Sequence, residues 1–187
     1  MKRALLLVVL VGLAASLVGA AAAVTTPAAA TDRLPSLDQR VLAALNETRV
    51  KQGLRPLLAS EDLRSAAVAH SRAMLTSGFF AHDSRGGVSF ATRLKGFYRS
   101  AGFDTWAVGE NLFYSTGTVD AKDAIAAWLA SPGHRENMLA PSWREVGIGS
   151  VHSAAAAGQF GGNPTWVITV DFGARSGKAA TRTSRSP

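Results

Sequence analysis

The sequence predicts an α+β fold in which an antiparallel sheet packs on helices. Apolar residues recur at helical spacing through the first half of the chain, whereas the second half changes to strand-like runs interleaved with one further helix. The length of 187 residues fits one domain, and 47% hydrophobic with 18% charged residues is a globular composition. A chain of this size can bury a full core without a metal or a disulfide.

Three helices are expected in the first half, over residues 36–53, 60–78 and 89–101. Each segment starts at a serine and is closed by a glycine. Serine caps helix N-termini and glycine ends helices. In the second segment Glu61 and Asp62 follow the serine, where the helix dipole favours acids. A short extended link, residues 56–59, separates the first two helices.

The second half predicts three strands, over residues 106–115, 145–152 and 165–172. Thr118 is the expected cap of a fourth helix that carries Trp128. Ser-Pro-Gly at 131–133 interrupts this helix, and residues 134–139 resume as a short helical piece. An Ala/Gly-rich loop, 153–163, joins the last two strands as a long hairpin.

The chain ends predict export. A charged start, an apolar run and an Ala-rich end over residues 1–23 are typical of a secretory signal peptide, and residues 24–36 form a linker. An uncleaved membrane anchor is the alternative, because about 20 apolar residues can span a bilayer. After cleavage no integral membrane segment is expected. The domain is predicted at 37–173 and a basic disordered tail at 174–187.

Charge and cysteine content exclude several functions. The net charge of +7 is mostly terminal, since 14 basic and 13 acidic residues remain between Thr31 and Gly173. A nucleic-acid-binding domain would carry a basic patch on its folded part, so no nucleic-acid partner is expected. The chain has no cysteine, which excludes disulfides, thiolate metal sites and cysteine nucleophiles.

Three polar residues are the candidate site: His82, Glu110 and His134. Glycine precedes Glu110 and His134, and we expect it to bend the backbone so that each side chain faces a cleft. Two imidazoles and one carboxylate match the ligands of a catalytic zinc, and the same groups can transfer protons without metal. Alternatively, the histidines bond loop carbonyls and Glu110 caps a helix.

Five motifs occur in a characteristic order. They are Phe-x-His-x-Ser (80–84), Gly-Glu-Asn-Leu (109–112), Trp-Leu-x-Ser-Pro-Gly-His-Arg-x-Asn-Met-Leu (128–139), Glu-Val-Gly-Ile-Gly (145–149) and Asp-Phe-Gly (171–173). Together they resemble the bacterial secreted branch of the CAP superfamily, whose SCP-like domain occurs in cysteine-rich secretory proteins, antigen 5 and pathogenesis-related proteins. The resemblance covers residues 37–173.

The resemblance implies an α-β-α sandwich with a shallow His/Glu cleft that can hold zinc or another divalent cation. His82 and Glu110 match two of the family's four cluster residues. Ser131 stands where animal and plant members have an acid, and residues 141–144 lack their second histidine. His134 is the candidate for that gap, so His82, Glu110 and His134 are the predicted metal ligands.

Three function classes stay open, and no catalytic residue is assigned. The first, which we favour, is a secreted or envelope-associated binding module for a small ligand, a glycan or cell-wall component, or a protein partner, with or without a divalent metal. The second is a zinc-dependent hydrolase that uses His82, Glu110 and His134. The third is a structural or interaction protein without a ligand.

Overall fold

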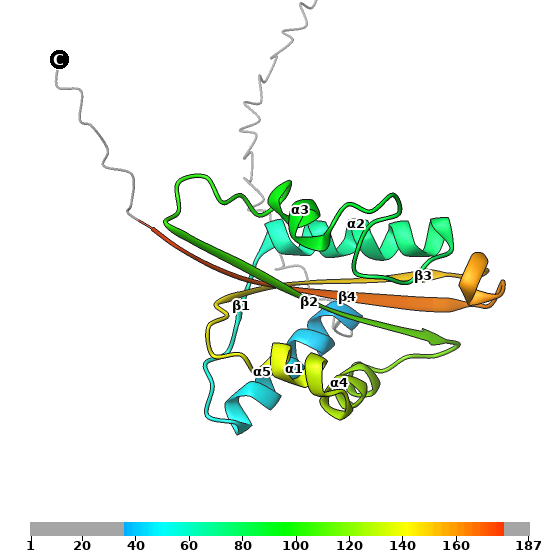
Figure 1. Ribbon diagram of the computed structural model, residues 1–187. Helices are drawn as coiled ribbons and strands as arrows, with labels where there is room; N and C mark the ends of the chain where they lie inside the picture. Colours follow the sequence, from blue (N-terminus) through cyan, green and yellow to red (C-terminus); the bar gives the residue numbers. More distant parts are fainter. Residues whose placement is uncertain (1–35, 178–187) are drawn as a thin grey trace, which may run out of the picture. The chain divides into compact units, whose positions relative to one another are not determined.

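A computed structural model describes residues 36–177 (Figure 1). The described chain is α+β, as the sequence predicts, and its sheet has four strands where the sequence predicts three. The predicted signal peptide (1–23), the linker except Ser36, and residues 178–187 of the predicted tail lie outside the described residues.

The sheet has the strand order β1-β3-β4-β2. Strands β2 (Thr105–Thr116), β4 (Thr165–Ser176) and β3 (Glu145–Ser153) pair antiparallel. The expected extended link forms a fourth, two-residue strand, β1 (Leu58–Ala59), which pairs parallel with β3. The sheet is therefore mixed, and β2 is its long edge strand.

Helices cover both faces of this sheet, which gives the three layers of an α-β-α sandwich (Figure 1). The helices α2 (Glu61–Ser77) and α3 (Phe90–Lys95) lie on one face. The helices α1 (Leu37–Lys51), α4 (Ala121–Ala130) and α5 (Pro132–Leu139) lie on the other. A single-turn 3-10 helix, Gly158–Phe160, lies in the hairpin loop between β3 and β4.

Two predicted helix boundaries are wrong. Helix α3 ends at Lys95 rather than near residue 101, because the chain turns at Gly96 and brings Tyr98 into the core, where its side chain is buried. The Trp106 indole donates a hydrogen bond to the carbonyl of Tyr98 and secures this turn. Helix α4 begins at Ala121, since Asp120 rather than Thr118 supplies the capping side chain.

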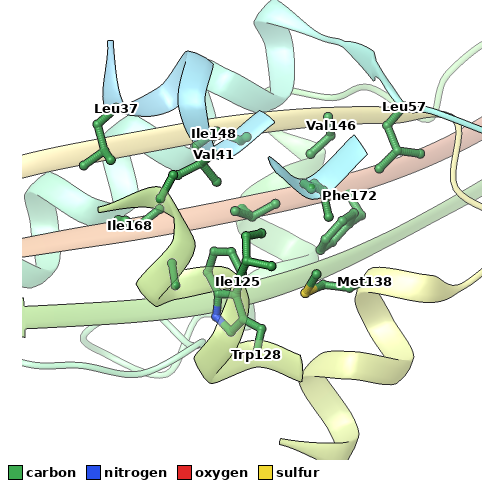
Figure 2. Packing of buried hydrophobic residues seen from close by; sticks show 14 of the residues in the cluster. Leu37, Val41, Leu57, Ile125, Trp128, Met138, Val146, Ile148, Ile168 and Phe172 are labelled. Carbon is green, nitrogen blue, oxygen red and sulfur yellow. The ribbon is translucent and has the colours of Figure 1, made fainter. Parts of the chain in front are cut away.

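The main core lies between the sheet and the layer of α1, α4 and α5 (Figure 2). Trp128 is 1% exposed, and its indole donates a 2.9 Å hydrogen bond to the carbonyl of Leu112 in β2. This contact fixes the end of α4 against the edge strand. The α5 helix, which begins after Ser131, is thereby held near the middle of β2.

A buried guanidinium joins α1 to α5. Arg49 is fully buried and donates hydrogen bonds to the carbonyls of Arg55, Met138 and Ala140, the last two at the end of α5. No carboxylate pairs with it among the described residues, and burial lowers its pKa. The helix that carries His134 is therefore fixed to α1 through its C-terminal carbonyls.

Candidate functional site

The three predicted residues come together in one cleft. His82 lies in the loop after α2, Glu110 lies in the middle of β2, and His134 lies in the first turn of α5. The Nδ1 atom of His82 is 2.8 Å from Oε1 of Glu110, and the rings of His82 and His134 are 6.5 Å apart between centroids. All three line a cavity of about 450 Å³.

The cleft lies across the edge of the sheet, because successive side chains of a strand point to opposite faces. Glu110 points to the face covered by α2 and α3. Asn111 points to the opposite face, where its amide donates to the His134 carbonyl and its side-chain oxygen accepts from Asn137, each at 3.0 Å. The Gly-Glu-Asn sequence thus contacts both helical layers.

Arg93 of α3 completes the site. It donates to Oε2 of Glu110 through Nη2 and to the His82 carbonyl at 2.7 Å through Nη1. The Glu110 side chain is fully buried, and Arg93 is 10% exposed. Sequence reasoning missed Arg93 because it lies 17 residues from Glu110 in another element, and no spacing rule joins the two.

Two further contacts hold the loop that carries His82. His70 of α2 is buried, and its Nε2–H donates to the carbonyl of Ala81 at 2.9 Å. Burial is the main cause that lowers the pKa of His70, which favours the neutral ring. Asp83 accepts a 3.2 Å hydrogen bond from the backbone N–H of Phe90 at the start of α3.

The glycines before Glu110 and His134 do not bend the chain as expected. Gly109 lies inside β2 without a positive φ, and a Cβ there would come within 2.5 Å of Asn137 Oδ1 and 2.8 Å of the Trp143 ring. It is glycine because α5 packs directly on the strand. Gly133 lies inside α5 with open space around it.

A second carboxyl lies beside Glu110. Asp171 of β4 is the cross-strand partner of Glu110 and is fully buried. Burial, and next the charge of Glu110, raise the pKa of Asp171 well above its usual value. Arg93, which contacts Glu110, is the cation nearest to this pair of carboxyl groups. The sequence placed Asp171 only in a motif, without a role.

These contacts bear on the predicted metal site. Among residues 36–177, no group of three or more His, Cys, Asp or Glu side chains is arranged to hold a metal ion. Both oxygens of Glu110 are engaged, one by His82 and one by the cation of Arg93. Burial, and then the charge of His82, lower the pKa of His134, which favours its neutral form. In this arrangement the carboxylate of Glu110 is a poorer metal ligand than the two imidazoles, and the three side chains together do not form a metal site.

Sequence comparison identifies the family. The model of the family described as "CAP: Cysteine-rich secretory protein family" matches residues 42–172. The chain belongs to the CAP family. Two Bacillus subtilis proteins are similar to this CAP chain. They are the uncharacterized protein YkwD, 32% identical over 130 residues, and the uncharacterized membrane protein YlbC, 31% identical over 112 residues.

The alignment with YkwD covers 70% of this CAP chain and 48% of YkwD. The alignment with YlbC covers 60% of this CAP chain and 31% of YlbC. The chain therefore spans half or less of the length of these two relatives. Solved structures show the same fold. An extracellular SCP-domain protein from Bacillus anthracis has a TM-score of 0.54 at 23% identity, over 76% of this chain and 40% of that one. An outer surface protein from Borrelia burgdorferi has a TM-score of 0.54 at 19% identity, over 73% and 90%.

No helix within residues 36–177 is both long enough and apolar enough to cross a bilayer.

Proposed function

We propose that this CAP domain is a secreted, envelope-associated binding module whose cleft at the edge of β2 holds a small polar ligand, a glycan before other classes. The observation that carries the proposal is that the carboxyl groups of Glu110 and Asp171 are buried below the polar groups that line the cleft. Glu110 is buried and fully engaged and Asp171 is buried, while imidazole, hydroxyl and amide groups line the opening. Such groups can form hydrogen bonds with a polar ligand.

The same observation weighs against Glu110 as the general base of the hydrolase alternative. A general base must reach the proton that it abstracts, directly or through one water. Glu110 is fully buried, and its two oxygens already accept from His82 and Arg93. The side chain of His82 is half-exposed, and because its Nδ1–H donates to Glu110, the Nε2 atom of the neutral ring can accept a hydrogen bond from a ligand.

The lining supports a glycan in particular. Ligand sites combine apolar surface with a few placed polar groups. Here Phe90 and Val108 supply the apolar part, and Ser131, His134 and Asn137 supply hydrogen-bonding groups around it. A sugar ring offers both kinds of surface, hydroxyls at its rim and C–H groups on its faces.

Secretion is supported by two facts. Residues 1–23 have the pattern of a signal peptide. The Bacillus anthracis relative is described as extracellular and the Borrelia burgdorferi relative as an outer surface protein. An envelope glycan would be the ligand that a protein in this location meets. Recovery of the chain from the medium, cleaved near residue 23, would test this part of the proposal.

The binding proposal is tested by NMR titration of the isotope-labelled protein with soluble N-acetylglucosamine oligosaccharides. We expect chemical shift changes at residues that line the cleft. We also expect His134→Ala to reduce the affinity for the oligosaccharide about tenfold, which is a loss of roughly 1.4 kcal/mol of binding free energy. The exposed His152 lies outside this cleft, so His152→Ala is the matched control and should bind like the wild type.

The other function classes are distinct outcomes of the same titration. Shortening of the oligosaccharide with time would support the hydrolase. Shifts away from the cleft, or an unchanged affinity in His134→Ala, would contradict the assigned site. A protein that binds no oligosaccharide, and whose cleft variants only lose stability, would favour the structural class.

A further inference from the structure

The position of Arg93 suggests which cation this site contains. Its guanidinium bonds the carboxylate of Glu110 and, through its other terminal nitrogen, the backbone carbonyl of His82. Two of the three predicted metal ligands are therefore joined by one side chain of the protein. We propose that Arg93 is the resident cation of the cleft, which takes the place of a divalent metal and disfavours metal binding.

Burial makes this ion pair persistent. The Glu110 side chain is fully buried and Arg93 is 10% exposed, so water screens their attraction little. A guanidinium stays charged at every physiological pH and has a fixed planar fork of donors. Arg93 therefore keeps its positive charge beside Glu110.

Geometry and charge then oppose metal at Glu110. A metal ion that bound either carboxylate oxygen would compete with the hydrogen bond that this oxygen now accepts. It would also lie close to the guanidinium, and two cations that are a few ångströms apart repel strongly where water is excluded. Asp171 offers no replacement, because its side chain is fully buried.

The function of Arg93 is thus to position Glu110 and the His82 loop. Removing its charge should expose one carboxylate oxygen and remove the repulsion, so that His82, Glu110 and His134 become available to one metal ion. This inference concerns the cation alone, and it holds whether or not the cleft binds a glycan.

The test is zinc titration by calorimetry of the metal-free protein, with NMR of the histidine rings to locate the bound ion. We expect Arg93→Gln to bind zinc at the cleft at least about tenfold more tightly than the wild type. Arg93→Lys keeps the charge and should show no gain. Arg72→Gln, which removes an exposed guanidinium of α2, is the matched control.

A second substitution ties the gain to this site. Adding His82→Ala to Arg93→Gln should remove the increase in zinc affinity. Equal zinc affinity of the wild type and Arg93→Gln, whether tight or absent, would overturn the proposal. The wild type supplies a separate test that needs no variant: zinc at micromolar concentration that shifts the rings of both His82 and His134 would also overturn it.

Discussion

His70 shows at the scale of one residue how the site depends on a side chain outside the cleft. Its ring is buried in α2, yet its N–H holds the carbonyl of Ala81, directly before His82. A buried imidazole that must stay neutral makes stability sensitive to acid. The loop that presents His82 is therefore coupled to the protonation of a histidine that does not line the cleft.

The first prediction concerns this pH dependence. Burial lowers the pKa of folded His70 below its usual 6.5, so in acid the unfolded chain takes up the proton first. The free energy of unfolding should be at its full value above about pH 6.5 and fall as the pH decreases toward the folded pKa. In His70→Gln, urea unfolding at pH 7.5 and pH 5.5 should show a smaller difference than in the wild type.

His134 contributes to the same pH dependence, because its pKa is also lowered. His134→Gln should remove its own part, and the variant with both changes should show the smallest difference between the two pH values. An unchanged pH dependence in His70→Gln would contradict the assignment of a buried, neutral ring.

At the scale of single residues, the candidate site residues could be predicted from the sequence, but the side chain that bonds to Glu110 and the His82 loop could not. His82, Glu110 and His134 could be found because each belongs to a distinctive motif. Arg93 could not, since it lies in a helix whose sequence carries no such mark. Its pairing depends on how the 79–89 loop folds back along β2, which is a tertiary property.

At the scale of elements, α2 and β3 approach unusually closely, and two glycines allow it. A Cβ on Gly149 would lie 2.3 Å from the backbone nitrogen of Val68, and one on Gly147 would lie 2.0 Å from that of Arg64. Both glycines are in β3 and have ordinary φ values. The two glycines of the Gly-Ile-Gly motif are thus needed because no side chain fits between this strand and α2.

The second prediction follows from this contact. Gly149→Ala should lower the free energy of unfolding by about 1–3 kcal/mol, because α2 must move to admit a methyl group. Gly133→Ala is the matched control, since it adds a methyl to α5 where nothing lies within 4 Å. The control should gain up to about 1 kcal/mol from helix propensity. Thermal and urea unfolding measure both, and equal losses would contradict the close approach.

The elements themselves were largely predictable from the sequence. Ser36 and Ser60 cap α1 and α2 as expected, because capping depends on neighbouring residues alone. The early end of α3 was not predictable, since it depends on burial of Tyr98 against Leu63 and Leu94. The pairing of β1 was missed for the same reason, because two residues form a strand only where β3 is available.

At the scale of the whole molecule, the predicted domain boundary at Gly173 cuts through a strand. Strand β4 continues to Ser176, and its last residues pair with the start of β2. Arg175, assigned to the tail from sequence, lies with its guanidinium 4.0 Å from the ring centre of Tyr98 and 4.8 Å from that of Phe103. It also lies 3.5 Å from Asp62 and 3.6 Å from Glu145.

The third prediction compares two truncations. A chain that ends at Gly173 loses the Arg175 contacts and three pairs of the β2–β4 ladder, and should be less stable by about 2 kcal/mol or more. A chain that ends at Gly177 loses none of the described residues and should unfold closer to the wild-type temperature. Calorimetric melting of the two proteins decides, and equal melting temperatures would contradict the extended boundary.

The cleft also joins parts of the molecule that the backbone keeps apart. His82 belongs to the side of the sheet that α2 and α3 cover, and His134 belongs to the side of α1, α4 and α5, with only the edge of β2 between them. A ligand that binds both imidazoles would act as a reversible cross-link around this edge. This chain has no cysteine, so it has no disulfide that could link the two helical layers. A ligand bound in the cleft would provide such a link, and the two layers would separate more slowly during unfolding while the ligand is bound.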